Sequence, residues 1–203
     1  MKIALFASFI VFSLWVLYEA TKRRRLHEKA LQKYLDIEAQ ANSVRKKDLG
    51  NLTYITIPED ILSFHLMTDN PTVIECLQQL NSLKDKKIVN LTGITNTELK
   101  FTYGTSNITI LTEYDQNYTL FARNIYRLGE AVYKEGYIKE AKDILELGVQ
   151  TKTDISGNYT ILAKIYRSLG EIERIKTLKD TASSLNSMIK ITILQSLDEI
   201  ARI

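Results

Sequence analysis

Proline, glycine and cysteine are all scarce in this chain. Two prolines and eight glycines in 203 residues leave few points at which the backbone must break or turn. An all-β fold needs many short strands joined by Gly- and Pro-rich turns, so the scarcity favours helices. We therefore expect a mainly α fold.

The shortage of cysteine and histidine also narrows the possible functions. Cys76 is the only cysteine and cannot form an internal disulfide, while His27 and His65 are too far apart in sequence to suggest a zinc site. A Gly-rich phosphate loop and a nucleophile elbow are missing as well. We expect no enzyme activity, no cofactor and no metal site, and we expect the Cys76 thiol to be buried.

Positive charge is concentrated in one segment. Residues 21–48 hold nine Lys and Arg against four Asp and Glu, whereas the whole chain has a net charge of only +3. A basic segment beside an apolar run is typical of a protein that contacts anionic lipid. It is not the extended basic surface of a nucleic-acid-binding protein, so we expect no nucleic acid partner.

An apolar run opens the chain. Ile3 to Tyr18 is uncharged, and with Glu19 and Ala20 a helix here would be roughly 27 Å long at about 1.5 Å per residue, close to the thickness of a bilayer core. Trp15 and Tyr18 lie near its end, where aromatic rings favour the headgroup region. We predict a transmembrane anchor over residues 1–20. A cleaved signal peptide is the alternative, but the A-x-A cleavage pattern is missing because Tyr18 stands two positions before Ala20.

The orientation follows from the charges that flank this run. Lys22, Arg23, Arg24 and Arg25 follow it almost directly, and only Lys2 precedes it. The positive-inside rule then places the N-terminus outside and the C-terminal domain in the cytoplasm. Five Asn-x-Thr sequons would matter only in a secretory lumen. They begin at Asn51, Asn90, Asn107, Asn117 and Asn158.

Residues 21–49 contain no proline and no glycine before the turn at Gly50-Asn51, and they predict a helical stalk. Ala30, Tyr34, Ile37, Ala41 and Val44 recur at helical spacing and form one apolar face. Either this face dimerises the protein as a coiled coil, or it packs on the chain's own soluble domain. It covers about two heptads, fewer than a coiled coil usually needs, which favours the second interpretation.

Residues 50–118 predict a mostly helical middle region. Leu52 to Ile57 is rich in β-branched residues and could form one strand. Pro58, Asn70-Pro71 and the Thr95-x-x-Glu98 capping box each predict the start of a helix.

The C-terminal region, residues 119–203, contains an internal repeat. The segments Leu128–Gly136 and Leu162–Gly170 align with an offset of 34 residues, which superimposes Gly136 on Gly170. A helix–turn–helix period of 34 is the signature of tetratricopeptide repeats. Small residues, Gly129 and Ala163, stand where two helices of one repeat would approach closely, and Ala141 stands where the second helix would cross.

The sequence resembles the tetratricopeptide repeat family over about residues 122–186. The family pattern is met in the first repeat by Leu128, Gly129, Gly136, Ala141 and Leu145, and in the second by Tyr159, Leu162, Ala163, Tyr166, Gly170 and Ala182. Departures are Ile125, Ile175 and Lys179, and Thr153 and Ser187 replace the proline that commonly closes a repeat. Residues 95–118 could supply a third hairpin, and Ile191–Ile203 a capping helix.

The resemblance implies a groove, lined by the first helix of each repeat, that binds a protein or peptide. By family position the groove residues are Arg123, Tyr126, Glu130, Tyr133, Lys134, Thr160, Lys164 and Arg167. The asparagines that some members use to clamp a C-terminal carboxylate are missing. We expect a membrane-tethered adaptor that binds a partner protein at the cytoplasmic face. The alternative is a structural protein of the envelope or division machinery that self-associates as a homodimer through the stalk.

The expected orientation can be tested with intact cells. Protease added outside should leave residues 50–203 undigested, because the Lys22–Arg25 cluster holds them in the cytoplasm. Immunoblotting of a C-terminal tag would measure this, and lysed cells must show complete digestion as the control. Cleavage near Ala20, or a glycan on Asn51 or Asn158, would contradict the predicted orientation.

Overall fold

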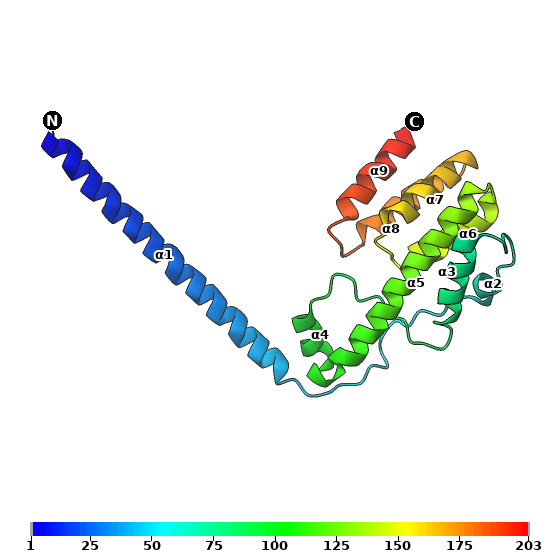
Figure 1. Ribbon diagram of the computed structural model, residues 1–203, viewed down its shortest axis with the longest axis horizontal. Helices are drawn as coiled ribbons and strands as arrows, with labels where there is room; N and C mark the ends of the chain where they lie inside the picture. Colours follow the sequence, from blue (N-terminus) through cyan, green and yellow to red (C-terminus); the bar gives the residue numbers. More distant parts are fainter. Residues whose placement is uncertain (1, 203) are drawn as a thin grey trace. The chain divides into compact units, whose positions relative to one another are not determined.

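A computed structural model describes the backbone of residues 2–202 and the side chains of residues 9–202. It confirms a mainly α fold (Figure 1). The helices are α1 (Lys2–Asn42), α2 (Glu59–Leu62), α3 (Pro71–Asn81), α4 (Asn96–Tyr103), the 3-10 turn η1 (Thr105–Asn107), α5 (Ile108–Lys134), α6 (Ile138–Gln150), α7 (Ser156–Ser168), α8 (Ile172–Ser183) and α9 (Lys190–Arg202). Residues 52–57 do not form a strand; within the described backbone they contribute one antiparallel bridge, between Tyr54 and Val89.

The helices belong to two compact units. Unit 1 comprises Met1–Lys47 and Asn96–Asn107, and unit 2 comprises Asp48–Thr95 and Ile108–Ile203. α1 continues through position 20, where we placed the end of the anchor, and stops at Asn42. α5 begins at Ile108, ahead of position 119, where we placed the start of the repeats.

In unit 1 the last turns of α1 pack on α4. Ala41 is fully buried there, and Glu38 accepts hydrogen bonds from Lys100 and, at 2.7 Å, from the Thr97 hydroxyl. The bond from Lys100, followed by that from Thr97, holds the pKa of the Glu38 carboxyl below its ordinary value. The Asn107 amide donates to the carbonyls of Lys47 and Tyr103, both at 2.7 Å. The apolar face of the stalk is therefore covered at its C-terminal end.

The rest of that face is open in the described structure. Tyr34 is 59% exposed and Ile37 is 38% exposed, and Leu26, Leu31 and Leu35 are also exposed. α4 thus covers Ala41 and leaves the stretch from Leu26 to Ile37 without a partner among the described residues.

Part of the expected anchor lies outside the residues whose side chains the structure describes. The side chains of residues 1–8, which open the predicted span at 1–20, lie outside the described residues. Across the part of the chain that is described, we find no helix that combines the length and the apolar character needed to cross a membrane.

Unit 2 contains two helical hairpins that repeat every 34 residues, α5–α6 and α7–α8. α6 begins at Ile138 and α8 at Ile172. Both turns are made by a glycine with positive φ, +87° at Gly136 and +74° at Gly170. The hydrogen bonds repeat too, because the N–H of the next residue reaches five residues back, from Tyr137 to Val132 and from Glu171 to Tyr166. This is the Schellman arrangement, which glycine favours for its left-handed backbone.

The joints after α6 and α8 also repeat. At Thr153 and Ser187, where the family commonly has proline, the side-chain hydroxyl accepts a hydrogen bond from the N–H two residues on. The distances are 3.2 Å from the Ile155 nitrogen to Thr153 Oγ1 and 3.4 Å from the Ile189 nitrogen to Ser187 Oγ. At both joints a side-chain hydroxyl therefore stabilises the turn.

Small residues let the helices approach. A Cβ added to Gly129 would lie 2.6 Å from Leu145 Cδ2, so α5 and α6 meet with no room for a side chain. Ala141 and Ala163 are fully buried. Lys179, at a position where the family has an apolar residue, forms an ion pair with Asp198 of α9, the helix that packs on α7 and α8.

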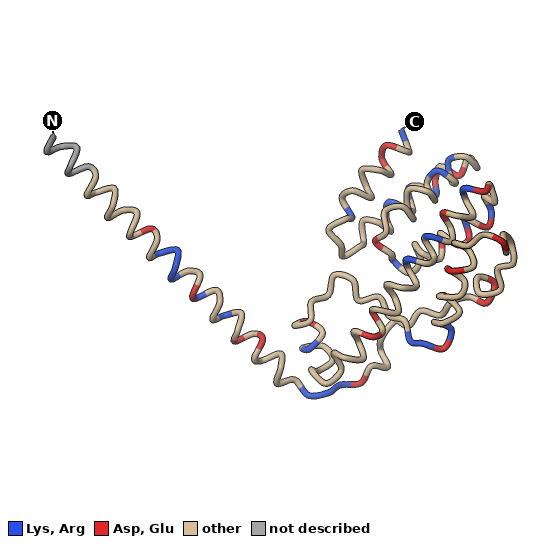
Figure 2. The backbone as a smooth tube through the Cα atoms, viewed as in Figure 1, with Lys and Arg blue, Asp and Glu red and all other residues tan. Residues whose placement is uncertain are grey.

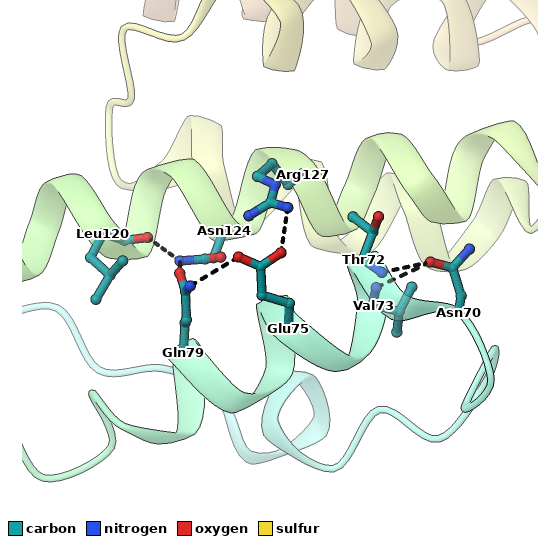
Figure 3. Close-up of polar contacts among 8 residues, drawn as sticks. All are labelled: Asn70, Thr72, Val73, Glu75, Gln79, Leu120, Asn124 and Arg127. Carbon is teal, nitrogen blue, oxygen red and sulfur yellow. Dashed lines mark hydrogen bonds and ion pairs between the residues drawn. The ribbon is translucent and has the colours of Figure 1, made fainter.

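On the other side of α5, the short helix α3 contributes buried apolar residues to the same core. It also makes polar contacts with α5, which Figure 3 shows. The Asn70 side chain caps α3 by accepting from the N–H groups of Thr72 and Val73. Arg127 of α5 pairs with Glu75 at 2.7 Å, and the Asn124 amide donates to Gln79 at 2.8 Å. Cys76 is fully buried on α3, as expected, and burial raises the pKa of its thiol.

Three of the five sequons have buried asparagines. Asn107, Asn117 and Asn158 each donate an amide N–H to a main-chain carbonyl, those of Lys47, Lys87 and Leu145 among them. Asn51 is exposed and Asn90 is half-buried. At three of the five sequons, a buried asparagine amide therefore satisfies a main-chain carbonyl.

Gly129→Leu should destabilise unit 2, because the new side chain would have to occupy the space of Leu145. Overpacking of this kind costs about 1–3 kcal/mol of the free energy of unfolding. Urea denaturation followed by circular dichroism would measure the loss. Thr119→Leu, which places the same side chain on an exposed position of α5, is the control and should change little; equal stability of the two variants would refute the close contact.

Candidate functional site

Seven of the eight groove residues named from sequence lie on two matching stripes of α5 and α7, and the eighth, Lys134, is the last residue of α5. Arg123, Tyr126, Glu130 and Tyr133 are spaced 3, 4 and 3 residues apart on α5, and Gly157, Thr160, Lys164 and Arg167 have the same spacing on α7. Residues with this spacing share one face of a helix. Each residue of one stripe is 34 positions from its counterpart, as the repeat requires.

The structure brings the two stripes together at Tyr126. Its ring lies so close to Gly157 that an added Cβ would be 2.6 Å from a ring carbon. Gly157 opens the α7 stripe, so Thr160, Lys164 and Arg167 continue along α7 from this contact. We call the eight residues, with Gly157, the α5–α7 face.

A chain of polar contacts runs along α5 within this face. The Tyr126 hydroxyl donates to Glu130 Oε1 at 3.0 Å, and Lys134 Nζ lies 3.2 Å from Glu130 Oε2. Burial raises the pKa of Tyr126 first, and its hydrogen bond to the Glu130 carboxylate raises it further. The neutral phenol therefore donates a hydrogen bond that orients the Glu130 carboxylate, and this carboxylate forms an ion pair with Lys134.

The other cations of the face are free. Among the described residues, Arg123, Lys164 and Arg167 form no ion pair and no side-chain hydrogen bond, while Arg127, Lys142 and Arg174 nearby are all paired with carboxylates. Four cations and one carboxylate give the face a net charge of +3. Chemically, it can bind carboxylates or another anionic group, with Tyr126 and Tyr133 offering partly buried rings.

Sequence reasoning missed a second polar assembly, at the turns that follow α6 and α8. A hollow of about 360 Å³ opens there, and its lining includes Asn90, Lys152, Asp154, Asn186 and Ser187. The Asn90 amide donates to the carbonyls of Thr151 and Lys152, at 3.0 and 3.1 Å. No local pattern around Asn90 predicts this assembly, because the two carbonyls that its amide binds are about 60 residues away in sequence.

Two buried tyrosines form hydrogen bonds with main-chain carbonyls of the α6–α7 turn. The Tyr118 hydroxyl donates to the Thr151 carbonyl at 3.2 Å, and the Tyr159 hydroxyl to the Thr153 carbonyl at 2.9 Å. Burial, and then the negative charge of Asp154, raise the pKa of both phenols far above the ordinary value. The folded protein therefore favours the neutral form of these hydroxyls.

Within the described residues, no group of three or more His, Cys, Asp or Glu side chains is arranged to hold a metal ion. His27 and His65 are both exposed.

Comparisons with protein-family models, with curated proteins and with solved structures found no match to this chain.

The tyrosines give stability a pH dependence of known sign. Because folding raises their pKa, their contribution is complete below the unfolded value of about 10 and is lost as pH rises above it. Each phenol should then add a slope of up to about 1.4 kcal/mol per pH unit. Tyr159→Phe should lower stability by about 0.5–1.5 kcal/mol at neutral pH and flatten the alkaline slope.

Urea denaturation between neutral pH and pH values above that of free tyrosine would measure both effects. Tyr137→Phe, which removes an exposed hydroxyl, is the matched control. An alkaline slope that is the same in Tyr159→Phe and in the parent protein would show that the Tyr159 phenol ionises freely in the folded state.

Proposed function

We propose that this protein is a membrane-tethered helical adaptor that binds an acidic segment of a partner protein on its α5–α7 face, at the cytoplasmic side of the membrane. The observation that carries the proposal is the set of unpaired cations, Arg123, Lys164 and Arg167, on two adjoining helical stripes. In unit 2 most other Lys and Arg side chains near the hairpins already have a carboxylate partner.

A tetratricopeptide-like arrangement of α5–α8, with α9 as its cap, is part of this proposal. It is supported by the 34-residue period of the hairpins, by the paired glycine turns, and by the close packing at Gly129. Lys179, the strongest departure from the family pattern, has a local reason, since Asp198 of α9 neutralises it. In such an arrangement the α5–α7 face would line the binding groove.

The membrane tether is the second part of the proposal. α1 is helical from Lys2, and its side chains from Phe9 to Tyr18 are apolar apart from Ser13, with nearly all of them exposed. The basic cluster, Lys22–Arg25, follows this stretch after Glu19, Ala20 and Thr21, and is part of the blue run on α1 in Figure 2. It would meet anionic headgroups there. The same cluster would keep unit 2 in the cytoplasm and the N-terminus outside.

An acidic partner fits the chemistry of the face better than an apolar one. Guanidinium groups bind carboxylates through two parallel hydrogen bonds, and Arg123 and Arg167 have all their donors available. Exposed charges at this spacing attract a partner over several ångströms and are screened by salt. Recruitment should therefore weaken as ionic strength rises.

A second candidate function, self-association through α1, is favoured by one observation. Leu26, Leu31, Tyr34, Leu35 and Ile37 are exposed on a single helix, and only the turn that follows them is covered by α4. Concentration-dependent dimerisation of a variant lacking residues 1–20 would favour this structural role over the adaptor.

The adaptor predicts that Lys164→Glu combined with Arg167→Glu abolishes recruitment without lowering the melting temperature. The two residues are three apart on α7 and point the same way, so the local charge changes by four units. Like charges across an interface cost several kcal/mol, whereas exposed substitutions usually alter folding by only about 0.5 kcal/mol. Co-purification with tagged full-length protein from native membranes is the measurement.

The control is Lys139→Glu with Lys176→Glu, which makes the same change of charge at exposed positions on α6 and α8. It should leave recruitment intact. If the α7 variant keeps every partner, or if both variants lose the same partners, the α5–α7 face is not the binding surface.

A further inference from the structure

An apolar projection lies at the end of unit 2 where α8 turns into α9. Met188 is 96% exposed, which leaves almost all of its side chain outside the protein. Beside it, Ile191 is 65% exposed, and Ile94 and Ile189 are exposed too. Single exposed apolar residues are ordinary on protein surfaces, but four that gather on two adjoining turns form a patch. We call these four residues the apolar tip.

The two turns that carry the tip are joined and held in place. The Asn186 amide donates to the Gly93 carbonyl at 2.9 Å, which ties the turn before Ile94 to the turn before Met188. Gly93 has φ +79° and lies against the Asn186 backbone with no room for a Cβ. Ser187 donates to Asp154 at 2.9 Å, so the Met188 turn is also fixed to the α6–α7 turn. These contacts hold the two turns together, and a surface that is preorganised in this way loses less entropy on docking.

Positive charge flanks the tip. Met188, Lys190 and Ile191 line one hollow of about 470 Å³, and this hollow shares Asn186 and Ser187 with the neighbouring one, which Lys152 lines. Across both hollows the only carboxylate among the described lining residues is Asp154, and Ser187 already donates to it. Lys152 and Lys190 form no ion pair within the described chain.

We propose that the apolar tip inserts into the boundary between the headgroups and the acyl chains of an anionic lipid bilayer, and gives unit 2 a second contact with the membrane. The inference rests on the tether of the proposed function, which keeps the domain beside the bilayer and so makes a weak contact effective. Apolar side chains flanked by lysine are the combination that anionic interfaces bind.

The shape of the tip favours lipid over a protein partner. A protein interface needs a complementary surface packed as closely as a protein interior. Met188 stands out almost free of neighbouring atoms, and a fluid bilayer can surround such a side chain without complementary shape. Met is also unbranched and flexible, which suits an irregular environment.

The test uses full-length protein reconstituted in phosphatidylcholine–phosphatidylserine vesicles. Met188→Cys is labelled with an environment-sensitive fluorophore, and the buried Cys76 leaves 188 as the reactive position. The label should emit at shorter wavelength than in detergent and should be quenched by lipids that carry bromine on the acyl chain. Leu169→Cys, an exposed position at the α7–α8 turn, is the matched control and should show neither change.

The charge requirement is tested with the same label. Lys152→Gln and Lys190→Gln should each weaken insertion about fivefold, as expected for a lysine near an anionic surface. Equal quenching in pure phosphatidylcholine, with no effect of the lysine variants, would overturn the assignment to anionic lipid.

The remaining outcomes also decide. A shift to shorter wavelength without acyl-chain quenching would mean that a protein surface or a second copy covers the tip, and the proposal would be wrong. If the label is not quenched but the protein resists carbonate extraction, insertion of the apolar tip is refuted and the α1 tether is supported. If the label is not quenched and carbonate extracts the protein from the vesicles, both the insertion of the tip and the α1 tether are refuted.

Discussion

The close approach of α5 and α6 at Gly129 is the contact on which the rest of unit 2 depends. With Leu145 against the bare backbone of Gly129, the hairpin closes tightly enough for the glycine turn at 136 to join the two helices directly. The same hairpin recurs 34 residues later, so α7 arrives beside α5 in a fixed register. That register places Gly157 under Tyr126 and aligns the two stripes of the α5–α7 face.

Much of this could be predicted because the signals are local. Helix starts at Pro58 and Asn70-Pro71, the turns at Gly136 and Gly170, and the 34-residue period depend on residues that are near one another in sequence. The stripe on each helix follows from spacings of three and four, which fix direction without any knowledge of packing. The buried thiol of Cys76 follows from its place on an amphipathic helix.

What could not be predicted depends on partners far away in the chain. The pairing of Lys179 with Asp198 turns an apparent defect of the second repeat into a contact with α9. The packing of α4 on α1 joins Glu38 to Lys100, so no pattern within the stalk could show which part of its apolar face is covered. The chain of polar contacts from Tyr126 through Glu130 to Lys134 could have been predicted, because its members are four residues apart on one helix. The lack of carboxylate partners for Arg123, Lys164 and Arg167 could not, because it depends on where every neighbouring carboxylate lies in the folded protein.

The buried asparagines at 107, 117 and 158 have a practical consequence for producing this protein. Each stands in an Asn-x-Thr sequence, and each uses its amide N–H inside the folded chain. A eukaryotic secretory pathway attaches sugar to such asparagines while the chain is still unfolded, and an amide that carries a glycan can no longer fit in the core. Export through that pathway would convert three stabilising side chains into three obstacles to folding, so a host that makes the protein without the glycosylation machinery is the appropriate source.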